Sequence, residues 1–199
     1  MPRPKQRTPA LRERVLRAAV ETLAGDGIAG FTARRVAQDA ATSVPAVYEL
    51  FGDKAGLVRE VFFEGFRQLR RRLDELSEGD DPRADLLAVV ATFRTFVREN
   101  PVLAEIMFSR PFVDFDPGPE DRQATASVRE FIVGRVRRAV EEGVIAGDPT
   151  DIAHVLLALA QGLAVQEGGR WLGRSAASVN RRWEVGVRGL LRGFAHPAV

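Results

Sequence analysis

Apolar side chains recur every three or four residues through most of the chain, which is the spacing of one face of an α-helix. Leu11, Val15, Ala18, Ala19 and Thr22 form the first such stripe, and Thr8-Pro9 before it is a typical helix start. No segment shows the alternation of apolar and polar residues that a half-buried strand requires. The pattern therefore predicts an all-helical protein.

Capping residues and glycine or proline breaks divide this pattern into about nine helices. Gly25 and Gly27 end the first helix, Thr32, Ser43 and Asp53 cap the next three, and the polar SEGDDP at 77–82 is the clearest break in the chain. The expected helices are 9–24, 32–40, 43–51, 54–76, 83–99, 101–109, 118–143, 149–168 and 175–194.

Two short helices joined by a tight turn and packed on a longer first helix form a helix-turn-helix unit, whose second helix enters the DNA major groove. The stretch SVPAVYELFGDK at 43–54 is then the recognition helix and the start of the next helix. Tyr48 falls on its outer face, where a phenol can donate to a phosphate oxygen, and Lys54 adds a cation at a helix N-terminus. Thr32 suits a phosphate, and Arg34 could contact guanine.

The whole signature from about 11 to 61 resembles the DNA-binding domain of TetR-family transcriptional repressors: VLRAAVETLAGDGIAGFTARRVAQDA, the helix ending in VYELF, and FGDK leading into Leu57. NPVLAEIMF resembles one type of the family's ligand-binding half. The resemblance implies a basic arm and helix-turn-helix domain at 1–54, a ligand-binding and dimerisation domain at 55–199, and a connecting helix between them. It implies DNA contacts from these residues: Thr32, Arg34, Ser43, Pro45, Ala46, Tyr48 and Lys54.

Three positions depart from the family pattern. Ala41 replaces the usual turn glycine, which costs on the order of 1 kcal/mol if the site has positive φ. Glu49 presents a carboxylate where a DNA-contacting residue is common, and Leu50 stands where His or Tyr is common. These departures bear on affinity and base preference rather than on the fold.

Charge is uneven along the chain. Residues 1–20 carry six arginine and lysine side chains against Glu13 alone, a net +5, whereas the whole chain has a net charge of +2. A basic end on a nearly neutral body suits a phosphate-rich partner, although a solubilising tail has the same composition. The longest apolar run, IAHVLLALAQGLAV, is too short for a membrane span, and the N-terminus lacks the apolar stretch of a secretory signal. We expect a cytoplasmic protein that binds no membrane.

The second half supplies candidates for sensing and pairing. A cavity between helices is the usual ligand site in such domains. Its expected apolar lining, which favours a lipophilic or aromatic effector, comes from Phe93, Phe96, Met107, Phe108, Phe112, Phe115 and Phe131, with Arg94, Gln161 or His154 as a polar anchor.

Two stripes on the last helices predict a homodimer, which the family builds from four helices around a two-fold axis. The principal positions are Leu156, Leu159, Leu163, Trp183, Val187, Leu190 and Leu191, with small residues at Ala158, Gly162, Gly186 and Gly189 allowing close approach. Packing within one subunit would explain the same stripes.

Enzymatic functions have little support. The chain has no cysteine and only two histidines, His154 and His196, and it contains no HExxH, GxSxG or glycine-rich phosphate loop. We therefore predict no catalytic residue, metal or cofactor. A helical enzyme with unrecognised catalytic groups, or a partner-binding module that has lost operator recognition, remains the alternative to a ligand-responsive repressor of a pseudo-palindromic operator.

Overall fold

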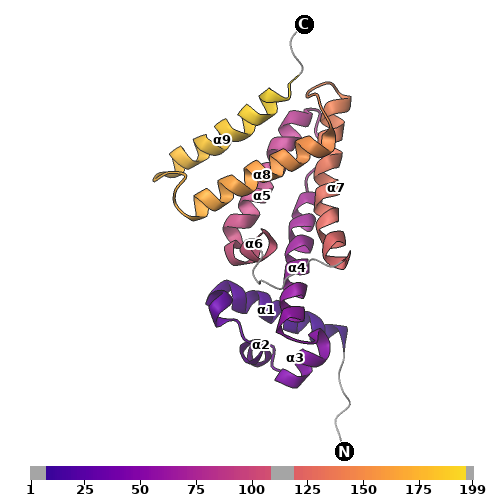
Figure 1. The fold of residues 1–199 in the computed structure, drawn as a ribbon, viewed down its shortest axis with the longest axis vertical. Helices are drawn as coiled ribbons and strands as arrows, with labels where there is room; N and C mark the ends of the chain where they lie inside the picture. Colours follow the sequence, from indigo (N-terminus) through magenta and orange to yellow (C-terminus); the bar gives the residue numbers. More distant parts are fainter. Residues whose placement is uncertain (1–7, 109–118, 196–199) are drawn as a thin grey trace, which may run out of the picture. The chain divides into compact units, whose positions relative to one another are not determined.

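The computed structural model describes residues 8–108 and 119–195, and this part of the chain consists of helices joined by turns (Figure 1). The helices are α1 (Pro9–Gly30), α2 (Ala33–Asp39), α3 (Val44–Phe51), α4 (Lys54–Asp74), α5 (Pro82–Glu99), α6 (Pro101–Phe108), α7 (Pro119–Glu141), α8 (Pro149–Gly168) and α9 (Ala176–Gly193). The all-helical class and the helix order predicted from the pattern are confirmed. None of these helices is both long and apolar enough to cross a membrane.

The first helix runs further than its glycines predicted. Only Gly27 leaves helical geometry, with φ of 66°, and a last turn follows it to Gly30. Gly25 stays helical, because a glycine ends a helix only where the chain uses its freedom to adopt positive φ. The helix expected at 9–24 therefore extends to Gly30, with a kink at Gly27.

The described residues divide into two compact units. The first comprises those within 1–66 and 100–121, and the second those within 67–99 and 122–199. Helix α4 contributes to both units, and α6 belongs to the first. The division predicted at residue 54 stays a prediction about domains.

The core of the first unit joins α1, α2, α3 and the start of α4. Its fully buried side chains include Val15, Val36, Val47, Leu57 and Phe31. Helices α4 and α6 cross at Gly65, where a Cβ atom would lie 2.5 Å from Met107 Sδ. Next to this crossing, Phe66 packs edge-to-face on Phe108 with ring centroids 5.8 Å apart.

The second unit packs α5 on α8 and α8 on α9 (Figure 1). Asp148 caps α8 by accepting hydrogen bonds from the N–H groups of Thr150 and Asp151, and Ser175 caps α9 through Ser178 N–H. Arg138 on α7 holds the turn before α5 by donating to the Gly79 carbonyl and pairing with Asp85. These bonds fix the helix ends that surround the unit's core.

Candidate nucleic-acid interface and apolar cavity

Side-chain caps fix the starts of α2, α3 and α4. The Thr32 hydroxyl accepts from Arg35 N–H at 3.1 Å, and the Ser43 hydroxyl accepts from Ala46 N–H at 3.3 Å. The Asp53 carboxylate accepts from Gly56 N–H at 2.7 Å. A cap that binds its own helix terminus orients the first turn of that helix. The sequence therefore positions the start of each helix locally.

The turn between α2 and α3 contains the predicted backbone strain. Thr42 N–H donates to the Ala37 carbonyl at 2.8 Å, and Ala41 has φ of 47°. That value lies in the left-handed region, which alanine rarely adopts because its Cβ crowds the backbone there. Position 41 thus has the positive φ at which alanine is less favourable than the usual glycine.

The recognition helix presents its outer face as expected. Val47 and Phe51 are buried, whereas 41% of the Tyr48 surface is exposed. Pro45 and Ser43 are exposed at the start of the helix and Ala46 is half-buried; Glu49 is exposed and Leu50 half-buried. The small side chains at the N-terminal end leave the backbone accessible for an approach to base edges.

Lys54 begins α4 beside this helix and is exposed. Its Nζ lies 5.8 Å from the centroid of the Phe31 ring, a distance typical of cation–π contact. Gly56 follows two residues later, and a Cβ there would lie 1.9 Å from the Phe51 carbonyl oxygen. The close passage of α4 past the end of α3 therefore requires glycine at 56, and it brings Lys54 next to the recognition helix.

The two neighbouring arginines of α2 have different roles. Arg35 pairs with Asp39 at 3.0 Å and with Asp26 at 3.6 Å. Arg34 is exposed and forms no ion pair within the described residues. Of the two arginines of α2, Arg34 is thus the one without an ion pair in the described chain, and its contact with DNA stays a prediction.

Part of the basic N-terminal segment serves the fold. Arg14 Nε donates to the Ala40 carbonyl at 2.8 Å, and Arg12 pairs with Glu60 at 2.7 Å while its guanidinium lies 4.9 Å from the Phe51 ring centroid. The net charge of residues 1–20 predicts that both side chains belong to a basic surface. Their local sequence does not distinguish an arginine with an intramolecular partner from a free one. Residues 1–7, the rest of the predicted arm, lie outside the described residues.

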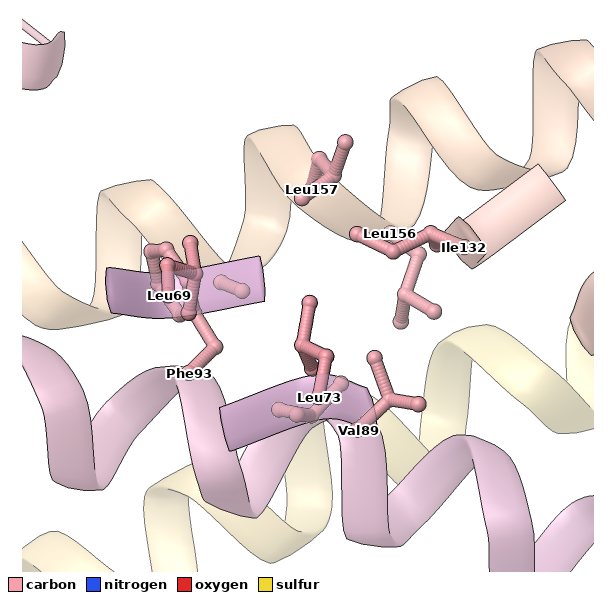
Figure 2. Close-up of a pocket in the computed structure, with 9 residues that line it drawn as sticks. Leu69, Leu73, Val89, Phe93, Ile132, Leu156 and Leu157 are labelled. Atoms are coloured by element: carbon pink, nitrogen blue, oxygen red, sulfur yellow. The ribbon is translucent and has the colours of Figure 1, made fainter. Parts of the chain in front are cut away.

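A small apolar cavity lies in the second unit (Figure 2). Its lining comes from α4, α5, α7 and α8: Leu69, Leu73, Val89, Val90, Phe93, Ile132, Leu156, Leu157 and Ala160. The free space is about 10 Å³, close to that of a single water-sized sphere. The lining side chains are all apolar, so the cavity suits an apolar group and would have to widen to accept one.

The predicted effector residues are distributed over separate places. Phe93 lines the apolar cavity, and Phe96 is fully buried elsewhere in the second unit. Phe131 packs under the guanidinium groups of Arg70 and Arg135, and Gln161 is half-buried on α8. Met107 and Phe108 belong to the first unit, and Phe112 and Phe115 lie outside the described residues.

The polar anchors proposed from the sequence are occupied or exposed. Arg94 donates two hydrogen bonds to Glu167, at 2.7 and 2.8 Å, and Trp183 Nε1 donates to the same carboxylate at 2.6 Å. The hydrogen bond from Arg94 holds the pKa of Glu167 below its usual range against the opposing effect of burial. His154 is exposed, and its Nδ1 lies 2.7 Å from the Thr150 carbonyl oxygen.

The predicted dimer residues are split between the interior and the surface. Leu156, Trp183, Val187 and Leu191 are buried within the chain, and Leu159, Leu163 and Leu190 are half-buried. At Gly186, α9 packs on α8, and a Cβ there would lie in ordinary contact with Leu163, 3.4 Å away, so the packing does not require glycine. Val155, which belongs to the predicted α8 stripe, is 44% exposed, whereas the most exposed apolar side chains of this unit, Val165, Trp171 and Val185, were not part of either stripe.

Across the described residues, no three His, Asp or Glu side chains gather in a way that could hold a metal ion. Glu142, which follows Glu141 at the end of α7, pairs with Arg138 at 2.7 Å. That contact gives Glu142 a structural role.

Two family descriptions match the chain. Residues 15–61 match the bacterial regulatory proteins of the tetR family, and residues 86–190 match the C-terminal domain of tetracyclin repressor-like proteins. HTH-type transcriptional regulator BetI of Stenotrophomonas maltophilia (strain R551-3) is 35% identical over 84 residues, which are 41% of this chain and 43% of that protein. The match thus spans less than half the length of that relative.

Solved structures share the fold. A protein of unknown function from Rhodococcus sp. RHA1 superposes with a TM-score of 0.81 at 26% identity, over 98% of this chain and 100% of that one. The TetR family transcriptional regulator PfmR from Thermus thermophilus gives 0.63 at 20% identity, over 88% and 97%. Because the C-terminal match alone spans more than half of the sequence, and the helix-turn-helix unit matches separately, the chain belongs to the TetR family of transcriptional regulators.

Proposed function

We propose that this regulator is a repressor that binds a pseudo-palindromic DNA operator as a homodimer and is released by a small lipophilic or aromatic effector. The observation that carries the proposal is the capped α2–turn–α3 unit with Arg34, Tyr48 and Lys54 exposed on successive elements. Its seven proposed DNA contacts are Thr32, Arg34, Ser43, Pro45, Ala46, Tyr48 and Lys54.

The seven residues would contribute to DNA binding in different ways. Tyr48 and Lys54 bind phosphates and set the position of the helix on the duplex, whereas Arg34 reads a base edge. The backbone at Pro45 and Ala46 approaches the groove. Thr32 and Ser43 use their hydroxyls as helix caps, which orients the two helices, and their exposure leaves room for a phosphate oxygen beside each cap.

The apolar cavity supports the effector class. A site lined by leucine, valine, isoleucine and phenylalanine has no partner for a sugar hydroxyl or a nucleotide phosphate, whose burial would leave polar groups unpaired. Leu69 and Leu73 of its lining belong to α4, the helix that begins at Lys54. Effector binding widens the cavity, moves α4 and favours the state that does not bind DNA. The free-energy shift between the two states cannot exceed the difference in the effector's binding free energy for them.

The test is fluorescence anisotropy with DNA from upstream of the protein's own gene against scrambled DNA, at two salt concentrations. A specific regulator binds the upstream fragment roughly a thousandfold more tightly, and its binding weakens as salt is raised. A saturating lipophilic compound that occupies the cavity should then release the DNA. Equal, weak binding to both fragments at both salt concentrations would count against operator recognition.

One observation favours a second candidate. The exposed carboxylate of Glu49 lies on the recognition helix, where it would repel DNA phosphates. This repulsion favours the alternative in which the chain keeps the fold but binds a partner other than an operator. Glu49→Gln separates the two: in a DNA-binding regulator it strengthens binding to all sequences, whereas in a partner-binding module DNA affinity stays weak.

A further inference from the structure

Trp171 is the most exposed large apolar side chain in the described residues, with 81% of its surface accessible, in the loop between α8 and α9. That loop is held in place. Trp171 N–H and Leu172 N–H both donate to the Gln166 carbonyl, at 2.9 and 3.0 Å, and Arg182 closes the loop by donating to the Leu172 carbonyl. A tryptophan presented on an ordered loop is a typical anchor of a protein interface.

An apolar stripe on α8 leads to this loop. Val155, Ala158, Gly162 and Val165 are all accessible to solvent, and their spacing of three and four residues places them on one face of the helix. Val165 is 74% exposed and Val155 44%. Exposed apolar side chains that line up on one face of a helix and end in an exposed tryptophan are typical of an interaction surface.

The stripe matches a reversed copy of itself. Val155 and Val165 lie five residues on either side of Ala160, and Ala158 and Gly162 lie two residues on either side. When two copies of α8 pack antiparallel around the level of Ala160, each valine meets a valine and each small residue a small one. An isologous two-fold contact requires this kind of self-complementarity.

Charge follows the same symmetry. Residues 169–183 carry four arginines and no acidic residue, whereas residues 141–151, from the last residue of α7 to the first turn of α8, carry four acidic residues and no base. At 1.5 Å per residue, Asp151 lies about 14 Å from the level of Ala160, and the last residue of α8 lies about 12 Å from it on the other side. An antiparallel partner therefore brings its Asp151 level with Arg170.

The charged residues of this proposed contact are available. Arg170, Arg174 and Asp151 take part in no ion pair in the described part of the chain. Arg129 and Arg137, which border the depression beside Thr150, lie on the α7 side of α8. Thr150 precedes Asp151 by one residue, or about 100° around the helix, so these arginines flank the stripe instead of lying on it.

We infer that α8 pairs antiparallel with α8 of a second copy of this chain, so that the Arg170-Trp171 loop of one protomer docks on the partner's Asp151 at the start of its α8. The inference rests on the proposed homodimer and specifies its register. Trp171 anchors each end of this contact, because it occurs twice in the dimer.

The test is a charge-swap cycle measured by sedimentation equilibrium on the full chain at low salt. Arg170→Glu and Asp151→Arg each place like charges together twice in the dimer and should weaken dimerisation about tenfold or more, whereas the double variant restores it. Trp171→Ala should weaken dimerisation by roughly tenfold to thirtyfold. Arg34→Glu, which changes the net charge equally in the other unit, should leave the dimer unchanged.

The outcomes separate this inference from the dimer itself. A wild-type chain that sediments as a monomer overturns both. A wild-type dimer whose strength none of the loop variants alters overturns only the docking of Trp171. Trp171 emission, taken as the difference between wild type and Trp171→Phe, should move to shorter wavelength on dimerisation. Trp171 emission that stays at the wavelength of a solvent-exposed side chain in the dimer would overturn the docking as well.

Discussion

Replacing Ala41 by glycine should stabilise this protein, although glycine usually destabilises. Ala41 has φ of 47° in the turn between α2 and α3, and its side chain is exposed. The substitution therefore removes a methyl group that makes little contact and a Cβ atom that crowds the backbone. The change isolates the conformational preference of one residue.

The magnitude is a difference between two effects. The left-handed conformation costs a non-glycine residue about 1–2 kcal/mol, and glycine removes that cost. Glycine also gives the unfolded chain more freedom, which costs about 0.4–1 kcal/mol. The difference lies between about 0 and 1.6 kcal/mol, with a middle value of about 0.8 kcal/mol, which corresponds to a rise in Tm of roughly 2–3 °C for a chain of this size.

Urea denaturation followed by circular dichroism measures the change, with Ala24→Gly as the matched control. Ala24 is also exposed and lies in the same compact unit, but it is in the helical part of α1. The same substitution there should lower the free energy of unfolding by up to about 1 kcal/mol. The two variants should differ in sign, and a loss of stability in Ala41→Gly would refute a positive φ at position 41.

Three further predictions concern other parts of the molecule. Gly65→Ala places a Cβ 2.5 Å from Met107 Sδ and should cost about 1–3 kcal/mol in urea denaturation, whereas Gly134→Ala, at an exposed position of α7 with no atom within 4 Å of the added Cβ, should not destabilise. In DNA titrations, Lys54→Ala should weaken binding to every sequence and reduce the salt slope by about 1, whereas Arg34→Ala should relax base preference; an unchanged preference would remove Arg34 from base readout. Because the pKa of Glu167 is lowered in the folded chain, the unfolded chain binds a proton at this carboxylate more readily. The stabilisation by ionised Glu167 is therefore complete above the ordinary carboxyl pKa and is lost as pH falls through the folded-state pKa. Glu167→Gln should therefore cost about 1–3 kcal/mol at neutral pH and flatten the acid limb of the stability curve, whereas Glu184→Gln, in a surface pair with Arg188, should change stability by less than about 0.5 kcal/mol; equal effects would contradict the role of the partly buried Arg94–Glu167 pair.

Local features of the sequence were sufficient for the helices and for the outline of the DNA-binding unit. Thr32, Ser43 and Asp53 cap the helices that follow them through bonds to residues three positions ahead, so the signal and its effect lie within one turn. The same holds for the faces of α3, since Val47 and Tyr48 point inward and outward because of helical periodicity.

Only the tertiary structure decided which of several equivalent side chains are free. Arg34 and Arg35 are adjacent and identical in type, yet only Arg35 meets Asp26 and Asp39. The two tryptophans likewise lie close together in the sequence, but Trp183 is buried on Glu167 while Trp171 is exposed. Such differences depend on contacts between residues far apart in the chain, which periodicity and capping do not encode, because both describe the residue's own helix and not the element that packs against it.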